Sequence, residues 1–390
     1  MNFVQDYIKY NREKHRKQDL KEFIKENNIF FGSGGSENII IKVDEQKVIK
    51  IIPNFKKDPN SKELFDNDKK EIEFYKFFYQ HFIKKNITPH IVGYYDNYTL
   101  LNITKIFPKK CMTIEQKLLT KPEKINNVVD KLCQLKNLHD YHLINDTADI
   151  IVLENCPNTI AREIYSILAS KNKNKYEHLK DFLDRIIFQL IYTLTSIQHS
   201  YPTFIHNDLF LRNILGKNED KYSDNEYVEY IYNNVSYYLP ANGFYLKIND
   251  FGYSLLPPII MSKVYYKNLV FNPTKEMVYD DNLRDIYTFL YDLYNGENFG
   301  HPSVMAMIGN VSQKIIDDMR NYFSKYLNIN IIDKIIKNNK QLLDRQWNIK
   351  FIPILRKTVM EPKKYFEKGK FKQYKYLPND AVIVKTFQIN

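Results

Sequence analysis

The stretch FIHNDLFLRNIL, residues 204–215, sets five polar residues in a frame of leucine, isoleucine and phenylalanine. A segment this apolar is expected to be buried, and a buried polar group needs a hydrogen-bond partner. The polar residues therefore either satisfy one another in a core or point into a cleft and carry out chemistry. They are His206, Asn207, Asp208, Arg212 and Asn213. The rest of the chain has to decide between these two interpretations.

Patterns before this stretch predict strands and a helix. Residues 30–52 hold a glycine cluster, an isoleucine-rich run, a polar turn and a second apolar run, which is typical of a β-hairpin headed by a flexible loop. Lys50 lies on the second strand of that hairpin. The pattern of residues 61–83 predicts a helix, and residues 90–98 and 149–157 are expected to form strands.

Patterns on the other side of the stretch are mostly helical. Apolar residues recur every three or four positions across residues 182–197, which predicts a helix directly before the opening stretch. Residues 216–243 form a polar insertion, and residues 244–252, FYLKINDFG, form a strand that ends at a glycine. From about residue 283 the pattern is mostly helical to the end of the chain.

Two motifs resemble the catalytic centre of the eukaryotic-protein-kinase-like superfamily. The opening stretch matches H-x-D-x-x-x-x-N through His206, Asp208 and Asn213, and residues 250–252 match Asp-Phe-Gly. The resemblance implies that Asp208 accepts or orients the proton of an attacking hydroxyl. It implies that Asn213 and Asp250 are oxygen ligands of Mg²⁺, and that His206 has the structural role of packing the loop.

The region before this centre resembles the nucleotide-binding motifs of the same superfamily. KVIK, which ends at Lys50, is similar to Val-Ala-Ile-Lys, and the resemblance implies that Lys50 holds the α- and β-phosphates of ATP. A carboxylate on the next helix should pair with it. We expect Glu71 rather than Glu73, because apolar residues three, four and seven positions after Glu71 place it on the inward face.

A glycine loop and a hinge complete the expected ATP site. GSGGSEN matches the first two glycines of G-x-G-x-x-G, whose amides close over phosphates, but its third position is Glu37. Residues 150–157, IIVLENCP, are similar to the strand and hinge of the superfamily. The expected phosphate contacts are Gly32, Ser33, Gly34 and Gly35, and the expected adenine contacts are Leu153 and the backbone of Glu154 and Cys156.

Four departures make this an unusual member of the superfamily. Asn207 replaces the arginine that meets a phosphorylated activation loop, so we expect an enzyme that is not switched in that way. Phe210 stands where many serine/threonine kinases carry a lysine, and Arg212 is placed as in tyrosine kinases. Arg212 either reaches the substrate or the transferring phosphate, or it caps the loop. The long gap from Asn213 to Asp250 and the absence of Ala-Pro-Glu resemble haspin-like kinases and kinases of large DNA viruses.

The resemblance implies an α+β, bilobal protein-kinase-like fold. We expect a small antiparallel β-rich N-lobe and a mostly helical C-lobe, with Asp285 on a buried helix anchoring the catalytic-loop backbone. We expect an N-terminal helical extension at residues 1–27 and an N-lobe at residues 28–156 with an insertion at about 98–147. The C-lobe is expected at residues 157–390, with an insertion at about 216–243 and a C-terminal helical region.

The expected activity is transfer of the γ-phosphate of Mg-ATP to a protein hydroxyl. Serine or threonine is favoured over tyrosine as the acceptor because most members of the superfamily use them. A small-molecule kinase of the aminoglycoside- or choline-kinase type is one alternative, although its metal motif more often reads Ile-Asp. A pseudokinase that only binds is another, against which the joint presence of Lys50, Asp208, Asn213 and Asp250 argues.

Composition and charge exclude several other classes of protein. The net charge is +11 over 390 residues, but the lysines are scattered among acidic residues, so we do not expect nucleic-acid binding. The three cysteines, Cys111, Cys133 and Cys156, are widely spaced without a CxxC, so we expect neither a disulfide framework nor structural zinc. We expect neither a secretory signal nor a membrane span. We expect a monomer that acts on a protein substrate in the cytoplasm or nucleus of a host cell, with packaging in a virion as an alternative location.

Overall fold

The computed structural model describes residues 39–55, 67–111, 127–142, 144–257, 259–260, 283–295, 303–309, 311–338 and 356–389. The helix predicted at residues 5–27 and the glycine loop lie outside these ranges. The chain divides into two compact units, Met1–Ile72 with Gly93–Asn155, and Glu73–Val92 with Cys156–Asn390. Helices and antiparallel sheets are both present, so the α+β fold class is confirmed.

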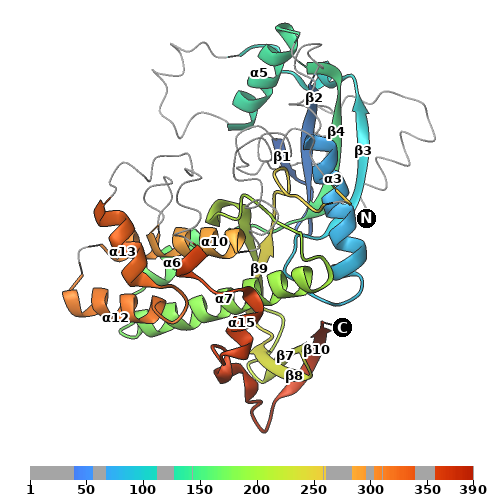
Figure 1. Ribbon diagram of the computed structural model, residues 1–390. Coiled ribbons are helices and arrows are strands. Elements are labelled where there is room, and N and C mark those ends of the chain that lie inside the picture. Colours follow the sequence, from blue (N-terminus) through green and yellow to red (C-terminus); the bar gives the residue numbers. More distant parts are fainter. Residues whose placement is uncertain are drawn as a thin grey trace. The chain divides into compact units, whose positions relative to one another are not determined.

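The first unit holds a four-stranded antiparallel sheet in the order β1-β2-β4-β3 (Figure 1). The predicted hairpin is confirmed, and Asp44 shapes its turn by accepting hydrogen bonds from the backbone of Gln46 and Lys47. The last strand starts earlier than predicted because its extra residues pair with both neighbouring strands. The strands are β1 (Ile39–Lys42), β2 (Lys47–Phe55), β3 (Tyr94–Leu101) and β4 (Ile144–Glu154).

One face of this sheet is covered by the short helix η2 (Ile103–Ile106) and by α5 (Asn127–Asp140). These elements and the sheet enclose an apolar cluster that includes Ile51 of β2. Lys50 lies on the opposite face of the sheet, because successive side chains of a strand point to opposite sides. The cluster consists of Ile39, Ile41, Ile51, Ile103, Ile106, Leu135, Ile144, Ala148 and Ile150. The core of the first unit therefore lies away from Lys50.

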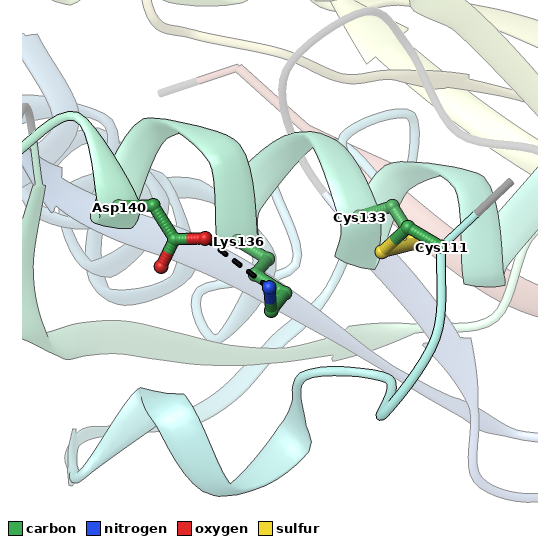
Figure 2. Close-up of a disulfide and its surroundings, with 4 residues drawn as sticks. All are labelled: Cys111, Cys133, Lys136 and Asp140. Atoms are coloured by element: carbon green, nitrogen blue, oxygen red, sulfur yellow. Dashed lines mark hydrogen bonds and ion pairs between the residues drawn. A yellow bond between two sulfur atoms is a disulfide. The ribbon is translucent and has the colours of Figure 1, made fainter. Parts of the chain in front are cut away.

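A disulfide ties the two covering elements of the first unit together. Cys111 follows η2 and Cys133 lies in α5, with their Cα atoms 5.7 Å apart (Figure 2). The sequence was expected to hold no disulfide framework, and this one disulfide was not predicted. The two residues are 22 positions apart, and they meet because η2 and α5 pack on the same face of the sheet, which their spacing does not reveal.

Replacing Cys133 with serine is expected to lower the free energy of unfolding by about 3 kcal/mol. A disulfide that closes a loop of this length restricts the unfolded chain by about that amount. Urea denaturation of the full chain measures the change. Cys156→Ser is the matched control, because Cys156 is also buried but lies outside the disulfide. A wild-type urea midpoint that is insensitive to a strong reductant would contradict the prediction.

The second unit is built around α7 (Lys175–Ser200), which extends the helix predicted at residues 182–197. Its side chains are buried without a break from Ile186 to Ile197, so it forms the centre of this unit rather than a surface helix. The helix predicted at residues 61–83 is observed as α3 (Asn67–Phe78) continued by η1 (Tyr79–Ile83), and the division between the units falls within α3.

Eight shorter helices of the described ranges also belong to the second unit. They are α6 (Ile160–Ala169), α10 (Arg284–Asn295), α11 (Val304–Ile308), α12 (Gln313–Phe323), α13 (Ile329–Asn338), η7 (Arg356–Thr358), α15 (Pro362–Glu367) and η8 (Lys372–Lys375). Among the helices of the described ranges, none combines the length and apolar character that crossing a bilayer requires.

The polar insertion and the end of the chain fold together into one sheet of the second unit. The hairpin β7 (Glu226–Tyr232) and β8 (Val235–Pro240) turns at Asn233 and Asn234, both of which have positive φ as a two-residue hairpin turn requires. The C-terminal strand β10 (Val382–Gln388) adds to β7 in parallel (Figure 1). This strand is an exception to the helical pattern expected there, because it pairs with residues about 150 positions earlier in the chain.

An aromatic cluster holds this sheet against α7. The ring of Tyr230 in β7 lies edge-on to Phe188 and Tyr192 of α7, with ring centroids 5.3 and 4.9 Å apart. Phe387 of β10 stacks on Tyr230 from the other strand. Phe366 and Phe371 pack on Phe188 as well. Burial of aromatic rings therefore joins the insertion, the C-terminal strand and the central helix into one core.

Candidate active site

Strand pairing in the second unit brings the two chemistry-bearing motifs together. The strands β6 (Ile214–Glu219) and β9 (Gly243–Ile248) are antiparallel, with Ile214 opposite Ile248. Asn213 precedes the first strand and Asn249 follows the second, so these residues meet at one end of the pair. The amide of Asn249 donates to the carbonyl of Asn213 at 3.0 Å. The insertion between the motifs therefore does not separate them in space.

Asp208 is held by two donors from its own loop. Nη2 of Arg212 donates to Oδ1 of Asp208 at 2.7 Å, and Nδ2 of Asn213 donates to Oδ2 at 2.6 Å. Burial raises the pKa of Asp208 above its ordinary value, while Arg212 and Asn213 oppose that rise. The guanidinium of Arg212 also lies over the ring of Phe210, 4.6 Å from its centroid. Arg212 thus contacts both the carboxylate of Asp208 and the ring of Phe210 within the loop.

The oxygen atoms of Asn213 and Asp250 suit a magnesium ion. Nδ2 of Asn213 also donates to the carbonyl of Asp208 at 2.7 Å, so Oδ1 is the amide atom suited to a cation. The described ranges contain no cluster of three or more His, Cys, Asp or Glu residues that could hold a metal. Mg²⁺ needs no such cluster, because it usually takes one or two protein oxygens together with water and phosphate. The donor set therefore fits Mg²⁺.

His206 has the buried, hydrogen-bonded position of a structural residue. Burial lowers the pKa of His206 to about 4, so the ring is neutral at ordinary pH. Its Nε2 donates to the carbonyl of Asn249 at 3.1 Å, and its ring lies 5.1 Å from that of Phe251. The histidine therefore ties the opening stretch to the Asp-Phe-Gly segment, in line with the structural role expected for it.

A carboxylate on α10 anchors the backbone of the loop. Oδ2 of Asp285 accepts from the amide of His206 at 2.7 Å, and Oδ1 accepts from the amide of Asn207 at 2.9 Å. The predicted contact between Asp285 and the loop backbone is confirmed. Asn207 has a φ of +69°, in the left-handed region that asparagine tolerates better than most residues.

A second carboxylate on the same helix, Asp292, also holds the loop and was not predicted from the sequence. Oδ2 of Asp292 accepts from the amide of Leu211 at 2.7 Å, and the side chain is fully buried. Burial raises the pKa of Asp292 to about 6. A spacing of seven residues places Asp285 and Asp292 on one face of a helix, and that spacing within an otherwise apolar helix is the signal that could have identified it.

Residues 253–255, which follow the Asp-Phe-Gly motif, are hydrogen-bonded to residues 205–207 of the opening stretch. Ile205 and Leu255 exchange backbone hydrogen bonds of 3.0 and 2.8 Å. The hydroxyl of Ser254 donates to the carbonyl of His206, and Nδ2 of Asn207 donates to the carbonyl of Tyr253. These contacts fix residues 253–255 against residues 205–207.

The structure describes some of the residues that are expected to bind the nucleotide. Nζ of Lys50 donates to Oε1 of Glu71 at 2.5 Å with both side chains almost completely buried, whereas Glu73 is exposed. The choice of Glu71 over Glu73 as the partner of Lys50 agrees with this geometry. The amide of Glu154 donates to the carbonyl of Gly93 at 2.8 Å. Gly32, Ser33, Gly34 and Gly35 lie outside the described residues, and Leu153 and Cys156 are buried.

Comparison with known proteins gives two relatives. No protein-family model matches the chain. A protein of Acanthamoeba polyphaga mimivirus that is named a putative serine/threonine-protein kinase is 35% identical over 399 residues, which cover 99% of each chain. A second mimivirus protein with the same designation is 27% identical over 199 residues, which cover 50% of this chain and 39% of the relative.

Proposed function

Since this chain belongs to the serine/threonine-protein-kinase family of its mimivirus relative, we propose that it transfers the γ-phosphate of Mg-ATP to a serine or threonine hydroxyl of a protein. The observation that carries the proposal is the meeting of the Asp208 loop with the Asp250 segment at the β6–β9 pair. The protein-kinase names of both relatives favour a protein substrate over a small molecule.

Asp208 is the residue that handles the proton in this proposal. Its carboxylate would accept or orient the proton of the acceptor hydroxyl, which places that oxygen in line with the phosphate. The donors on Asp208, Arg212 and Asn213, favour the ionised form that this role requires. Arg212 either only holds the Asp208 carboxylate within the loop or also contacts the substrate.

The other residues hold and screen the phosphates. Asn213 and Asp250 would hold Mg²⁺, which when bound neutralises charge on the phosphates. Lys50, fixed by Glu71, would bind the α- and β-phosphates. The loop residues Gly32, Ser33, Gly34 and Gly35 would cover the phosphates with their amides, and Leu153, Glu154 and Cys156 would receive the adenine. A two-lobed organisation, with an N-lobe at 28–156 and a C-lobe at 157–390, belongs to this proposal.

Phosphate transfer tests the proposal directly. The purified full chain is incubated with Mg²⁺ and γ-labelled ATP and offered a mixture of basic and acidic proteins. We expect label on protein, recovered as phosphoserine or phosphothreonine after hydrolysis. ATP binding without transfer to any protein would overturn the proposal, and so would label that appears only on an aminoglycoside or choline.

Replacing Arg212 with glutamine is expected to move the acidic limb of the kcat/KM profile to higher pH. The Arg212 guanidinium lowers the pKa of Asp208, so its removal lets burial raise that pKa further. Asp208 accepts a proton only as a carboxylate, and a larger fraction is then protonated at each acidic pH. Rates measured across pH for both forms check the shift.

The control for this experiment is Arg162→Gln, which removes an exposed guanidinium from α6. Its acidic limb should coincide with that of the wild type. Lower activity of Arg212→Gln with an unmoved limb would contradict the prediction and leave Arg212 with a substrate contact instead.

A further inference from the structure

A buried tyrosine hydroxyl lies against the backbone of the Asp-Phe-Gly segment. Tyr75, in the part of α3 that belongs to the second unit, donates from its hydroxyl to Oδ1 of Asn249 at 2.5 Å. The same oxygen accepts from the amide of Asp250 at 3.1 Å. The side chain is 1% exposed. One hydroxyl therefore contacts both the residue expected to bind metal and the residue before it.

Packing alone does not require this hydroxyl. The ring of Tyr75 lies edge-on to Phe251 at 5.2 Å, and its neighbours Phe74 and Phe78 on the same helix also pack on Phe251. A phenylalanine at position 75 would fill the same space and keep these ring contacts. It would also avoid burying a polar atom, which costs stability unless that atom is hydrogen-bonded. The two hydrogen bonds are thus what distinguishes tyrosine at this position.

The backbone that Tyr75 contacts is in a conformation that needs support. Asp250 has a φ of +64°, in the left-handed region that residues other than glycine seldom adopt. Its neighbour Asn249 is held on both sides, because its amide donates to Asn213 and its carbonyl accepts from His206. The Tyr75 hydroxyl adds an acceptor for the next amide, that of Asp250. The direction of the Asp250 side chain depends on this peptide, since φ and ψ set where Cβ points.

We propose that Tyr75 is a positioning residue whose hydroxyl holds the backbone of Asp250 so that its carboxylate and the amide oxygen of Asn213 face one Mg²⁺. The inference rests on the proposed function, in which Asp250 and Asn213 are the metal ligands. Removing the hydroxyl should lower the affinity for the metal ion and leave the direct contacts between protein and nucleotide unchanged. Partners that orient a metal ligand in this way typically change metal affinity or activity by about 10- to 100-fold when they are removed.

The test compares the full-length wild type with Tyr75→Phe. Manganese binding in the presence of a non-hydrolysable ATP analogue is measured by the electron paramagnetic resonance signal of free Mn²⁺. We expect the affinity for Mn²⁺ to fall by about tenfold. The Mg²⁺ concentration for half-maximal phosphate transfer should rise by a similar factor. The affinity for ATP in the presence of EDTA should not change.

Tyr192→Phe is the matched control for a lost buried hydroxyl. Tyr192 is also fully buried, but its hydroxyl donates to the carbonyl of Ile231, outside the candidate site. This variant should bind Mn²⁺ like the wild type. Asn249→Ala provides a second probe, because it removes the acceptor of the Tyr75 hydroxyl, and its effect on Mn²⁺ affinity should not add fully to that of Tyr75→Phe.

The outcomes separate this inference from the proposed function. An unchanged Mn²⁺ affinity in Tyr75→Phe would overturn the inference even if activity fell. An equal loss of ATP affinity in EDTA would also overturn it, because the hydroxyl would then support the fold rather than the metal. A wild type that binds Mn²⁺ and nucleotide but transfers no phosphate would overturn the proposed function, and the Mn²⁺ measurement would still decide the role of Tyr75.

Discussion

Replacing Asp208 with asparagine is expected to lower kcat for phosphate transfer by about a thousandfold. The amide is nearly the same size as the carboxylate but cannot take up the proton of the acceptor hydroxyl, and a positioned base typically contributes about 10²- to 10⁴-fold. Nucleotide affinity should hardly change, because Asp208 acts on the hydroxyl in this proposal. Single-turnover transfer of labelled phosphate measures the loss, and calorimetry measures ATP binding.

Asp181→Asn is the control for this substitution, since Asp181 is an exposed carboxylate on α7. It should transfer phosphate at the wild-type rate. A rate for Asp208→Asn within about tenfold of the wild type would contradict the assignment, because the loss would fall below the usual contribution of a general base. Loss of ATP binding together with transfer would instead indicate a disrupted loop.

Replacing Asp285 with alanine is expected to lower the free energy of unfolding by about 4 kcal/mol. The substitution leaves the amides of His206 and Asn207 without the carboxylate that accepts from both, and each unsatisfied buried donor costs about 1–3 kcal/mol. Denaturation in urea, followed by fluorescence of the full chain, measures the change. Because the same amides hold the loop that carries Asp208, activity should also fall in the folded variant.

The exposed Asp181 serves again as the comparison for stability. Asp181→Ala should change the free energy of unfolding by less than about 0.5 kcal/mol, as surface substitutions usually do. A similar, small loss for Asp285→Ala would contradict the anchoring role. That outcome would mean that water or a shifted side chain satisfies the two loop amides.

Several contacts of the candidate site could be predicted because they depend on local pattern. The pairing of Lys50 with Glu71 follows from which face of a helix carries the apolar residues. The anchoring by Asp285 was expected from the resemblance to the kinase superfamily, in which a buried helix after the two motifs carries such an aspartate. The position of Asp292 could also have been predicted, because it lies seven residues after Asp285, which is about two helical turns and places both on one face.

Other features depend on contacts that no local pattern encodes. The Cys111–Cys133 disulfide forms because η2 and α5 pack on the same face of the sheet and bring together residues 22 positions apart. The strand β10, VIVKTFQ, is rich in β-branched residues, but its parallel partner β7 lies about 150 positions earlier in the chain. Its residues alternate too little between apolar and polar to predict a buried strand, and most of them are exposed.

The sequence by itself determined which residue types stand at the candidate site and in what order, because a short motif and a helical period are properties of neighbouring residues. Only the tertiary structure decided which distant groups support them. The Tyr75 hydroxyl reaches Asp250 across 175 positions of the chain, and His206 reaches Asp285 across 79. The packing of helices and the register of β6 and β9 determine such contacts. Packing depends on many weak contacts between residues far apart in the chain, so no short stretch of sequence encodes it.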